Sequence, residues 1–308
     1  MKRQIKRVML ASFVQKIFPG SKIISYKKFK TVLVNPPYKI KINKPPKNLV
    51  IKISKLKRKY HLELSDKSLK YIYEKGIPSP KVYFSGKYNN QFISAMDFVQ
   101  GKTALEIFRK TNTNIKVKLL KNVGTELKKI HSLKIPSFWV HPKHEIKTER
   151  LWKVWTYQRI LKYLEFIKNK WPNFYPLLEE RLGIFKETLI NFEFSLVPLH
   201  WDYHLSNINA QPNGKITGIF DLENLMKGHN LADIGQTVYW LHLDSDSNKY
   251  SKYFLKGYKK QFNKKELLLI EGYEILHILA VTRSIWFKQK RLGWLIKKHK
   301  KMLEEILK

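Results

Sequence analysis

The character of the sequence changes near residue 100, and this change constrains the fold more than any other feature. Before it, short β-branched and aromatic runs are broken by Pro and Asn, as in TVLVNPPYKIKINKPPKNLVIKIS at residues 31–54. Such runs are typical of strands and turns. From residue 102 onward, apolar residues recur three and four positions apart, and this spacing predicts helices over 115–131, 150–170, 177–192 and 265–287.

The change predicts an α+β protein built from two parts. A small antiparallel β-sheet lobe with one main helix is expected at residues 1–98, followed by a larger, mostly helical lobe at residues 99–308. The chain has 308 residues, of which 43% are hydrophobic and 13% aromatic, so it can bury a sizeable core.

Cysteine usage and hydropathy bound the cellular setting. The chain contains no cysteine, which excludes disulfides and thiolate metal sites and fits a reducing compartment. The longest apolar stretch, at residues 267–281, is interrupted by Glu271 and Glu274, so no segment is expected to span a membrane. The apolar run near the N-terminus is broken by Lys16 before any cleavage site. We therefore expect a cytoplasmic protein.

The net charge of +36 points to an anionic partner: nucleic acid, an anionic membrane or an anionic substrate. Only nine of the 60 basic residues are Arg, the residue that reads guanine edges and binds phosphate with two hydrogen bonds. Sequence-specific nucleic-acid binding is thus disfavoured. A small-molecule or saccharide substrate is the expected partner, and the sequence does not indicate an oligomeric state.

A basic, amphipathic helix is predicted at residues 1–18. Its apolar residues recur at helical spacing: Ile5, Val8, Met9, Phe13 and Ile17. One interpretation is a membrane-surface helix, which would allow a peripheral contact with the anionic inner face of a membrane. The favoured interpretation is a helix packed on the domain, because any docked helix shows one apolar face.

One lysine lies in the middle of a predicted strand. In LVIKIS at residues 49–54, alternation sends Leu49, Ile51 and Ile53 to one face and Lys52 to the other. A helical segment follows and is predicted to end at Gly76, with Pro78 and Pro80 beyond it.

Two acids of this helix could turn towards Lys52 and fix its ammonium group to hold phosphate oxygens. These are Glu63 and Asp66, and the pattern leaves both open.

Oxygen-bearing side chains cluster in LHWDYHLSNI at residues 199–208, which supplies Asp202 and Asn207. Downstream, Asn213-Gly214 predicts a two-residue hairpin turn. The register of this turn sets residue 207 opposite residue 220, so Asn207 and Asp221 lie at the same open end of the hairpin. For both side chains to reach a common ion, one of these two residues must leave strand geometry. Carboxylate and amide oxygens are the ligands that Mg²⁺ prefers, so the three residues predict a magnesium site.

These residues resemble a known family. The segment HWDYHLSNI is similar to the catalytic loop of protein kinase-like phosphotransferases, and GIFDLENLMKGHNLADIG at residues 218–235 to their metal-binding segment. The form is that of the aminoglycoside phosphotransferase and choline kinase group. Two further stretches resemble this group. VGTELKKIHSL at residues 123–133 is similar to the group's helix before the catalytic loop, and SAMDFVQGKT at residues 94–103 is similar to its interlobe hinge. The resemblance covers residues 49–240 in consistent order.

The resemblance implies a two-lobed protein kinase-like fold and a kinase activity with ATP or GTP as phosphate donor. Asp202 would be the catalytic base, and Asn207 and Asp221 would hold Mg²⁺. Lys52 would contact the phosphates, with Glu63 or Asp66 as its partner, and Met96 and Phe98 of the hinge would bind the nucleotide.

The resemblance also implies structural roles around the loop. Asp233 would accept backbone hydrogen bonds from the catalytic loop, and His200 would be a scaffold residue. His204 has no assigned role.

Two departures from the family pattern stand out. Trp201 occupies a position that usually carries a small residue. No glycine-rich loop precedes Lys52, so the backbone amides of Ser21–Ser25 are expected to cover the phosphates, with Lys22, Lys27 or Lys28 adding charge.

The acceptor remains open at this stage. An aminoglycoside, choline, homoserine or a sugar is expected, and the alternative is a saccharide of the lipopolysaccharide core or another membrane-linked saccharide. A second alternative is a weak pseudokinase or a module that binds anionic surfaces. Four tryptophans of the helical lobe could stack on a sugar ring, although core packing is the favoured interpretation for most of them: Trp139, Trp152, Trp155 and Trp171.

Overall fold

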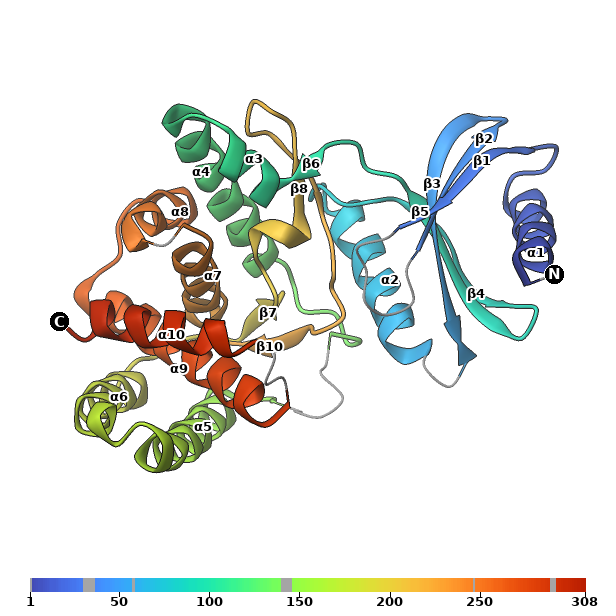
Figure 1. Cartoon of the computed structure of the whole chain (residues 1–308). Helices are drawn as coiled ribbons and strands as arrows, with labels where there is room; N and C mark the ends of the chain where they lie inside the picture. Colours follow the sequence, from blue (N-terminus) through green and yellow to red (C-terminus); the bar gives the residue numbers. More distant parts are fainter. Residues whose placement is uncertain (1, 30–36, 57–58, 140–145, 246, 289–291) are drawn as a thin grey trace. The chain divides into compact units, whose positions relative to one another are not determined.

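The computed structural model describes all residues except 1, 30–36, 57–58, 140–145, 246 and 289–291. The chain divides into two compact units, residues 1–101 with 217–223 and residues 102–216 with 224–308. An antiparallel sheet dominates the first unit and helices dominate the second, which confirms the predicted α+β class (Figure 1). The sequence pattern did not indicate that the short segment 217–223 belongs with the first unit.

The sheet of the first unit has five antiparallel strands in the order β1–β2–β3–β5–β4. The strands are β1 Ile23–Lys28, β2 Tyr38–Asn43, β3 Pro46–Lys55, β4 Val82–Tyr88 and β5 Gln91–Asp97. Alternation along β3 buries Leu49 and Ile51 on one face, as predicted. Lys52 therefore lies on the other face.

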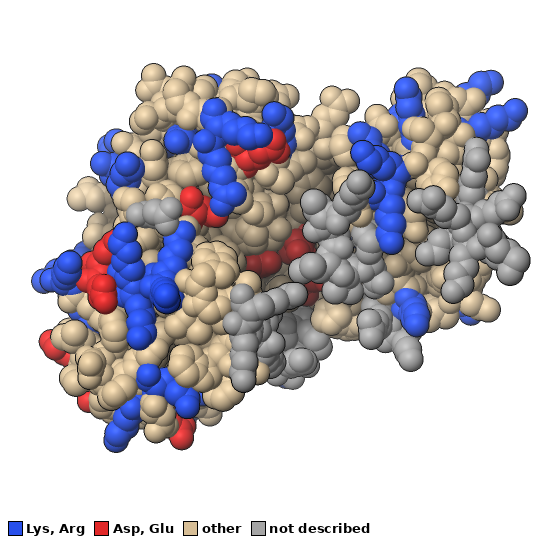
Figure 2. All heavy atoms as spheres, in the orientation of Figure 1, with Lys and Arg blue, Asp and Glu red and all other residues tan. Residues whose placement is uncertain are grey.

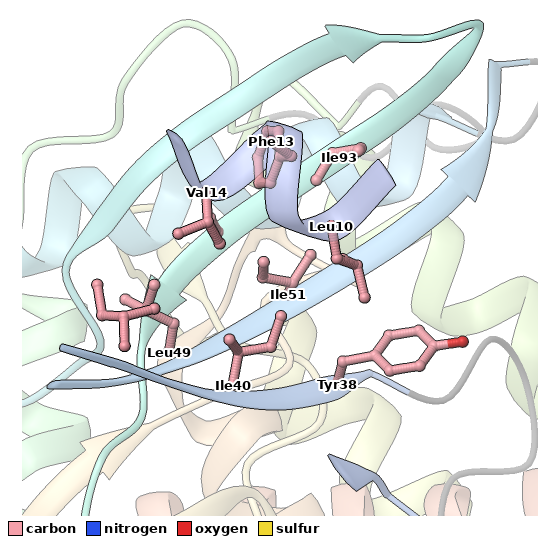
Figure 3. Close-up of a cluster of buried hydrophobic side chains, with 10 residues drawn as sticks. Leu10, Phe13, Val14, Tyr38, Ile40, Leu49, Ile51 and Ile93 are labelled. Atoms are coloured by element: carbon pink, nitrogen blue, oxygen red, sulfur yellow. The ribbon is translucent and has the colours of Figure 1, made fainter. Parts of the chain in front are cut away.

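Helix α1 (Lys2–Ile17) covers the apolar face of this sheet. Leu10, Phe13 and Val14 are each at most 1% exposed and lie over the strand residues of the same cluster (Figure 3). The predicted apolar face is partly wrong, because Val8 is 68% exposed and the buried face is rotated towards Leu10 and Val14. Since the sheet occupies this face, the structure supports the packed helix and not the membrane-surface alternative.

Helix α2 (Lys59–Glu74) packs on the opposite face of the sheet (Figure 1). It ends where the sequence predicts. Gly76 has a φ of 73°, a left-handed conformation that favours glycine, and the Ile77 amide donates to the Ile72 carbonyl at 3.0 Å.

The second unit is built mainly from eight helices among its described residues. They are α3 Ala104–Lys110, α4 Thr113–His131, α5 Glu149–Lys170, α6 Tyr175–Ile190, α7 Asn230–Ser245, α8 Ser251–Tyr258, α9 Lys264–Lys288 and α10 Gly293–Ile306. The four predicted helices correspond to α4, α5, α6 and α9 within two residues at each end. Side chains of Asn112 and Thr148 cap α4 and α5 by accepting from Ile115 N and Leu151 N.

Short elements link these helices. The strands are β6 Lys102–Thr103, β7 Val197–Leu199, β8 Ile208–Ala210, β9 Ile216–Ile219 and β10 Met226–Gly228, and the one-turn 3-10 helices are η2 Pro172–Phe174, η3 Leu205–Asn207 and η4 Asn248–Tyr250. Strand β7 pairs with β10 and β6 pairs with β8, both antiparallel.

Close helix packing fixes the elements around the loop after β7. Gly257 of α8 lies directly against α4, where an added Cβ would be 2.0 Å from the Lys121 carbonyl oxygen. Tyr203, in the loop itself, donates from its hydroxyl to the Val123 carbonyl of α4 at 2.9 Å. The loop is thus attached to a helix pair that cannot move apart without breaking backbone contacts.

The surface carries the large positive charge in dispersed form. Lys and Arg side chains are spread over the face shown in Figure 2, with Asp and Glu side chains among them. In the described part of the chain, no helix has both the length and the apolar character needed to cross a bilayer.

Candidate active site

The loop between β7 and β8 is held by one buried carboxylate. Asp233, at the start of α7, accepts from His200 N at 2.7 Å through Oδ2 and from Trp201 N at 2.9 Å through Oδ1. His131 of α4 donates to the same Oδ2 from Nε2 at 3.1 Å. These hydrogen bonds confirm the predicted role of Asp233 and fix the backbone directly before Asp202.

Asp202 and Asn207 are brought together within this loop. Asn207 Nδ2 donates to the Asp202 carbonyl at 3.0 Å and to its Oδ2 at 3.1 Å. Asn207 is the last residue of η3, and its backbone N donates a hydrogen bond to the His204 carbonyl at 2.9 Å. Because the amide nitrogen faces Asp202, the Asn207 Oδ1 is left as an acceptor or a metal ligand.

His204 is a loop residue for which the sequence pattern predicted no role. Its Nδ1 accepts from Ser206 N at 3.3 Å and so caps η3. Its Nε2 lies 3.6 Å from Asp202 Oδ1, and its ring lies 4.7 Å from that of Trp240. His204 is therefore a neighbour of the expected base. Its spacing of two residues from Asp202 was the only signal in the sequence.

His200 and Trp201 occupy contrasting environments. His200 is fully buried with its ring 5.4 Å from that of Tyr203, which fits a scaffold residue. Trp201 has a φ of 60°, the left-handed region that costs a non-glycine residue about 1–2 kcal/mol. Glycine is the residue that adopts this backbone conformation without steric cost. Here Trp201 packs on Trp152 and Trp155, at ring distances of 5.9 and 5.7 Å.

Lys52 lies on the α2 face of the first unit's sheet. It pairs with Ser94 in the β3–β5 ladder, so the two side chains share this face. Ser94 Oγ donates to Asp66 Oδ1 at 2.7 Å, and Ser85 Oγ donates to Asp66 Oδ2 at 2.6 Å. Burial raises the pKa of Asp66 to about 6, opposed by these hydrogen bonds and by the charges of Lys52 and Lys70.

The two acids left open by the sequence differ in their partners. Asp66 is fully buried and interacts electrostatically with Lys52. Glu63 forms an ion pair with Lys67, one turn along α2, at 3.2 Å. Asp66 is thus the acid of this pair for which an electrostatic interaction with Lys52 is found, and the choice of partner stays a proposal.

Asp221 belongs to the segment that joins the first unit. Ile219 N donates to the Pro78 carbonyl at 2.8 Å, which attaches this segment to the end of α2. Asp221 itself has a φ of 63°, so it has left strand geometry. Burial and the charge of Asp221 raise the pKa of Glu223, against the charges of Lys52 and His61.

Glu223 is thus influenced by the charges of both Asp221 and Lys52. The predicted approach of Asp221 to Asp202 and Asn207 stays a prediction.

The hairpin before this segment differs from the predicted one. Gln211 N donates to Lys215 O at 2.8 Å and Gly214 N to Gln211 O at 2.9 Å, so the loop has three residues and the register is shifted by one. Gly214 has a φ of 82° and its carbonyl accepts from Asn122 of α4 at 2.8 Å. A glycine in the left-handed third position of the loop and a contact with α4 therefore replace the two-residue turn.

The residues expected to cover the phosphates are not brought to Lys52. The first residues of β1 align with Lys47 of β3, whereas its last residues align with Ile51. Ser21 precedes β1 by two residues, so at about 3.3 Å per residue it lies roughly 23 Å from Lys52 along the sheet. Ser21 is buried and Ser25 is exposed. Residues 30–36, which connect β1 and β2, are outside the described residues.

The two hinge residues lie at the end of β5, Met96 within the strand and Phe98 directly after it. Met96 pairs with Val50 and is 2% exposed on the same face as Lys52. Phe98 N donates to the Asn48 carbonyl at 3.0 Å, and Lys39 Nζ lies 3.6 Å from the Phe98 ring centroid. Met96 could thus contribute apolar surface beside Lys52, while the Phe98 amide already has a partner.

The donor set fits Mg²⁺ as the resemblance implies. Asn207 offers an amide oxygen and Asp221 a carboxylate, both hard oxygen ligands. Within the described ranges, no group of three or more His, Asp or Glu forms a metal cage. A site with two protein ligands, completed by nucleotide phosphates and water, is the arrangement that such a donor set suits.

Comparisons with known proteins place the chain. The profile of the phosphotransferase enzyme family, APH, matches residues 35–268. The fold is similar to the AMP-bound complex of spectinomycin phosphotransferase APH(9)-Ia, with a TM-score of 0.62 and 17% identity over 97% of this chain and 96% of that one.

Two further solved structures agree. The aminoglycoside phosphotransferase APH(4)-Ia in its ternary complex with AMP-PNP and hygromycin B gives a TM-score of 0.65 and 12% identity over 96% and 97% of the two chains. The putative fructosamine-3-kinase from Haemophilus somnus 129PT gives a TM-score of 0.62 and 16% identity over 98% of this chain and 97% of that one. Among curated proteins, none matches. The solved structures confirm the protein kinase-like fold. The profile shows that the chain belongs to the phosphotransferase enzyme family, so the protein is a phosphotransferase with a hydroxyl acceptor.

Proposed function

We propose that this enzyme transfers the γ-phosphate of ATP or GTP to a hydroxyl group of a small molecule. The observation that carries the proposal is the pair of hydrogen bonds from Asn207 to Asp202, on a loop whose backbone is fixed by Asp233. The AMP, AMP-PNP and GDP complexes of similar structures support a nucleotide donor.

On the acceptor side, Asp202 is the proposed base. The acceptor oxygen attacks the γ-phosphorus while the bond from this phosphorus to the β–γ bridging oxygen breaks. The hydroxyl proton passes to the Asp202 carboxylate, and the nucleoside diphosphate leaves. Asn207 fixes the rotation of the Asp202 carboxyl, and His204 stands beside the same carboxylate, where it can stabilise the charged form.

On the donor side, Lys52 is proposed to contact the phosphates. Asp66 and Glu223 interact electrostatically with Lys52 and would hold its ammonium group on the α2 face. A single lysine anchored by acids is the arrangement that positions phosphate oxygens for transfer. This assignment replaces Glu63 by Asp66 as the partner of Lys52.

Asn207 and Asp221 are proposed to hold Mg²⁺. The ion, when bound, neutralises charge on the phosphate oxygens during transfer. Asn207 can serve because its amide nitrogen is engaged with Asp202 and its oxygen is directed elsewhere. Asp221 can serve because its left-handed backbone takes the residue out of the strand.

The test is Asp202→Asn with ATP or GTP and Mg²⁺, screened against aminoglycosides, choline, homoserine, simple sugars and lipopolysaccharide fragments. Phosphate transfer is expected to fall by about 10²–10⁴-fold, since a general base is lost, while nucleotide binding persists. Asp244→Asn is the matched control, because Asp244 pairs with Arg109 on α3 rather than with the loop. Undiminished transfer by Asp202→Asn would rule out this mechanism.

A further inference from the structure

An arginine that has no carboxylate partner in the described part of the chain lies against Trp201 of the catalytic loop. Arg159, on α5, has its guanidinium carbon 4.7 Å from the ring centroid of Trp155 and 5.7 Å from that of Trp201. Among the described residues it forms no ion pair with Asp or Glu, whereas Arg109 and Arg181 pair with Asp244 and Glu271. A half-buried guanidinium stacked on aromatic rings keeps its N–H donors for another acceptor.

The surroundings of Arg159 are aromatic or basic. Its charge helps to lower the pKa of His277 on α9, after the larger effect of burial, and His204 acts on the same ring. The acid at the start of α5, Glu149, is bound to Lys153 at 2.5 Å and to Phe194 N at 3.4 Å. Since no carboxylate of the described residues pairs with Arg159, its positive charge is not matched by a salt bridge.

The group adjoins the reaction centre through Trp201. Trp201 directly precedes Asp202, and both Trp201 and Trp155 are half-buried, while Trp152 beneath them is fully buried. Asp233 holds the Trp201 backbone amide at 2.9 Å. The Trp201 backbone is thus held directly before the proposed base, and the rings of Trp155 and Trp201 retain accessible surface.

This combination selects a chemical class of acceptor. A guanidinium binds phosphate or carboxylate with two hydrogen bonds, and indole rings pack on the apolar face of a sugar or polyol ring. A polycationic acceptor would bring its ammonium groups towards Arg159 and be repelled. Resting on the proposed function, we propose that the acceptor is an anionic sugar or polyol, with Arg159 binding its phosphate or carboxylate and Trp155 and Trp201 packing on its ring.

The experiment uses ligands that share a ring and differ in charge: glucose, glucosamine, glucuronate and glucose 6-phosphate. Binding to the full chain with Mg²⁺ and ADP is followed by tryptophan fluorescence, and phosphate transfer is measured separately with ATP. We expect the two anionic ligands to bind more tightly than glucose, and glucosamine more weakly. Arg159→Gln should raise the Kd of the anionic ligands about 10- to 100-fold and leave that of glucose unchanged.

Two further variants keep the test decisive. Arg159→Lys retains the charge but not the paired donors and should give an intermediate loss for the anionic ligands. Arg181→Gln removes an arginine of the same unit that is paired with Glu271 and should change none of the affinities. Thermal unfolding of each variant establishes that the fold is kept.

The outcomes separate this inference from the proposed function. Equal binding of anionic and cationic ligands, no binding of either anionic ligand, or equal effects of Arg159→Gln on all four would overturn the anionic acceptor. Charge-selective, Arg159-dependent binding without transfer to any acceptor would support the anion site and contradict the proposed kinase activity.

Discussion

Asp66 in the first unit and Asp233 in the second are both fully buried aspartates, yet their surroundings differ. Asp66 receives two serine hydroxyls, and burial raises its pKa to about 6. Asp233 receives two backbone amides and a histidine N–H. Backbone amides cannot turn away to another acceptor, whereas hydroxyls can, so the loss of Asp233 leaves more groups unsatisfied.

The comparison teaches that the two units hold their site residues in different ways. In the first unit, the buried Asp66 carboxylate near Lys52 lowers the free energy of unfolding when it is ionised. In the second, a charge organises the loop and contributes to stability. Variants that remove the two charges should therefore have opposite effects on stability while both reduce activity.

Asp233→Ala should give the largest effect. Removing the carboxylate leaves His200 N, Trp201 N and His131 unsatisfied, and the free energy of unfolding should fall by about 3–5 kcal/mol. Phosphate transfer should be lost together with stability, because the backbone before Asp202 is released. Denaturant unfolding and a transfer assay measure both. A stable Asp233→Ala enzyme with full activity would contradict the role of this carboxylate.

Asp66→Asn should act in the opposite direction on stability. Because the folded pKa is raised, the contribution of Asp66 is fully present below its unfolded pKa and is lost as the pH rises through about 6. At pH 8 the neutral variant should be more stable by about 1–3 kcal/mol, and near pH 4 the gain should vanish. Transfer should still fall, since Lys52 loses its partner. Urea unfolding at the two pH values checks this, and a loss of stability at pH 8 would contradict it.

A buried histidine of the second unit, His299, should make its stability depend on pH in the acid range. Its Nε2 meets the Tyr239 hydroxyl at 2.9 Å and its Nδ1 the Thr282 hydroxyl at 2.7 Å, and burial, with the charge of Lys298, lowers its pKa to about 4. A lowered folded pKa means that its stability contribution is complete above about 6.5 and is lost as the pH falls towards 4.

The difference in stability between the wild type and His299→Gln should therefore shrink by about 2 kcal/mol from pH 7.5 to pH 5. Denaturant unfolding at both pH values measures it. A difference in the free energy of unfolding that stays constant with pH would show that folding does not lower the pKa of His299.

Glu63→Gln should give the smallest effect. Glu63 pairs with Lys67 along the helix surface at 3.2 Å, an interaction worth about 0.3–0.5 kcal/mol. Stability and transfer should both stay near the wild type, in contrast to Asp66→Asn. A large loss of transfer in Glu63→Gln, measured as the KM for ATP, would restore Glu63 as the partner of Lys52.

Local signals in the sequence were sufficient for much of the fold. The period of the apolar residues placed Lys52 on the correct face, and Gly76 with its following prolines marked the end of α2, because both depend on neighbouring residues alone. The choice between Glu63 and Asp66 depends on how α2 is rotated over the sheet. That rotation involves Ser85 and Ser94, which come later in the chain.

Other features depended on contacts that no local pattern reveals. Asn213-Gly214 indicated a two-residue turn, but Asn122 of α4 binds the Gly214 carbonyl of a three-residue loop. Ser21 was expected near the phosphates because no glycine-rich loop precedes Lys52, whereas the register of β1 places Ser21 at the other end of the strand. Arg159 and His204 became candidates only through spatial neighbours.

Helix α1 has a consequence for how the chain can be shortened. The family profile begins at residue 35, yet Leu10, Phe13 and Val14 of α1 close the apolar face of the sheet. A fragment trimmed to the matched residues 35–268 would lack α1, β1, most of α9 and α10, and would expose Ile40 and Leu49 to water. Such a fragment should aggregate when expressed, so the boundaries of sequence similarity are narrower than those of the folding unit.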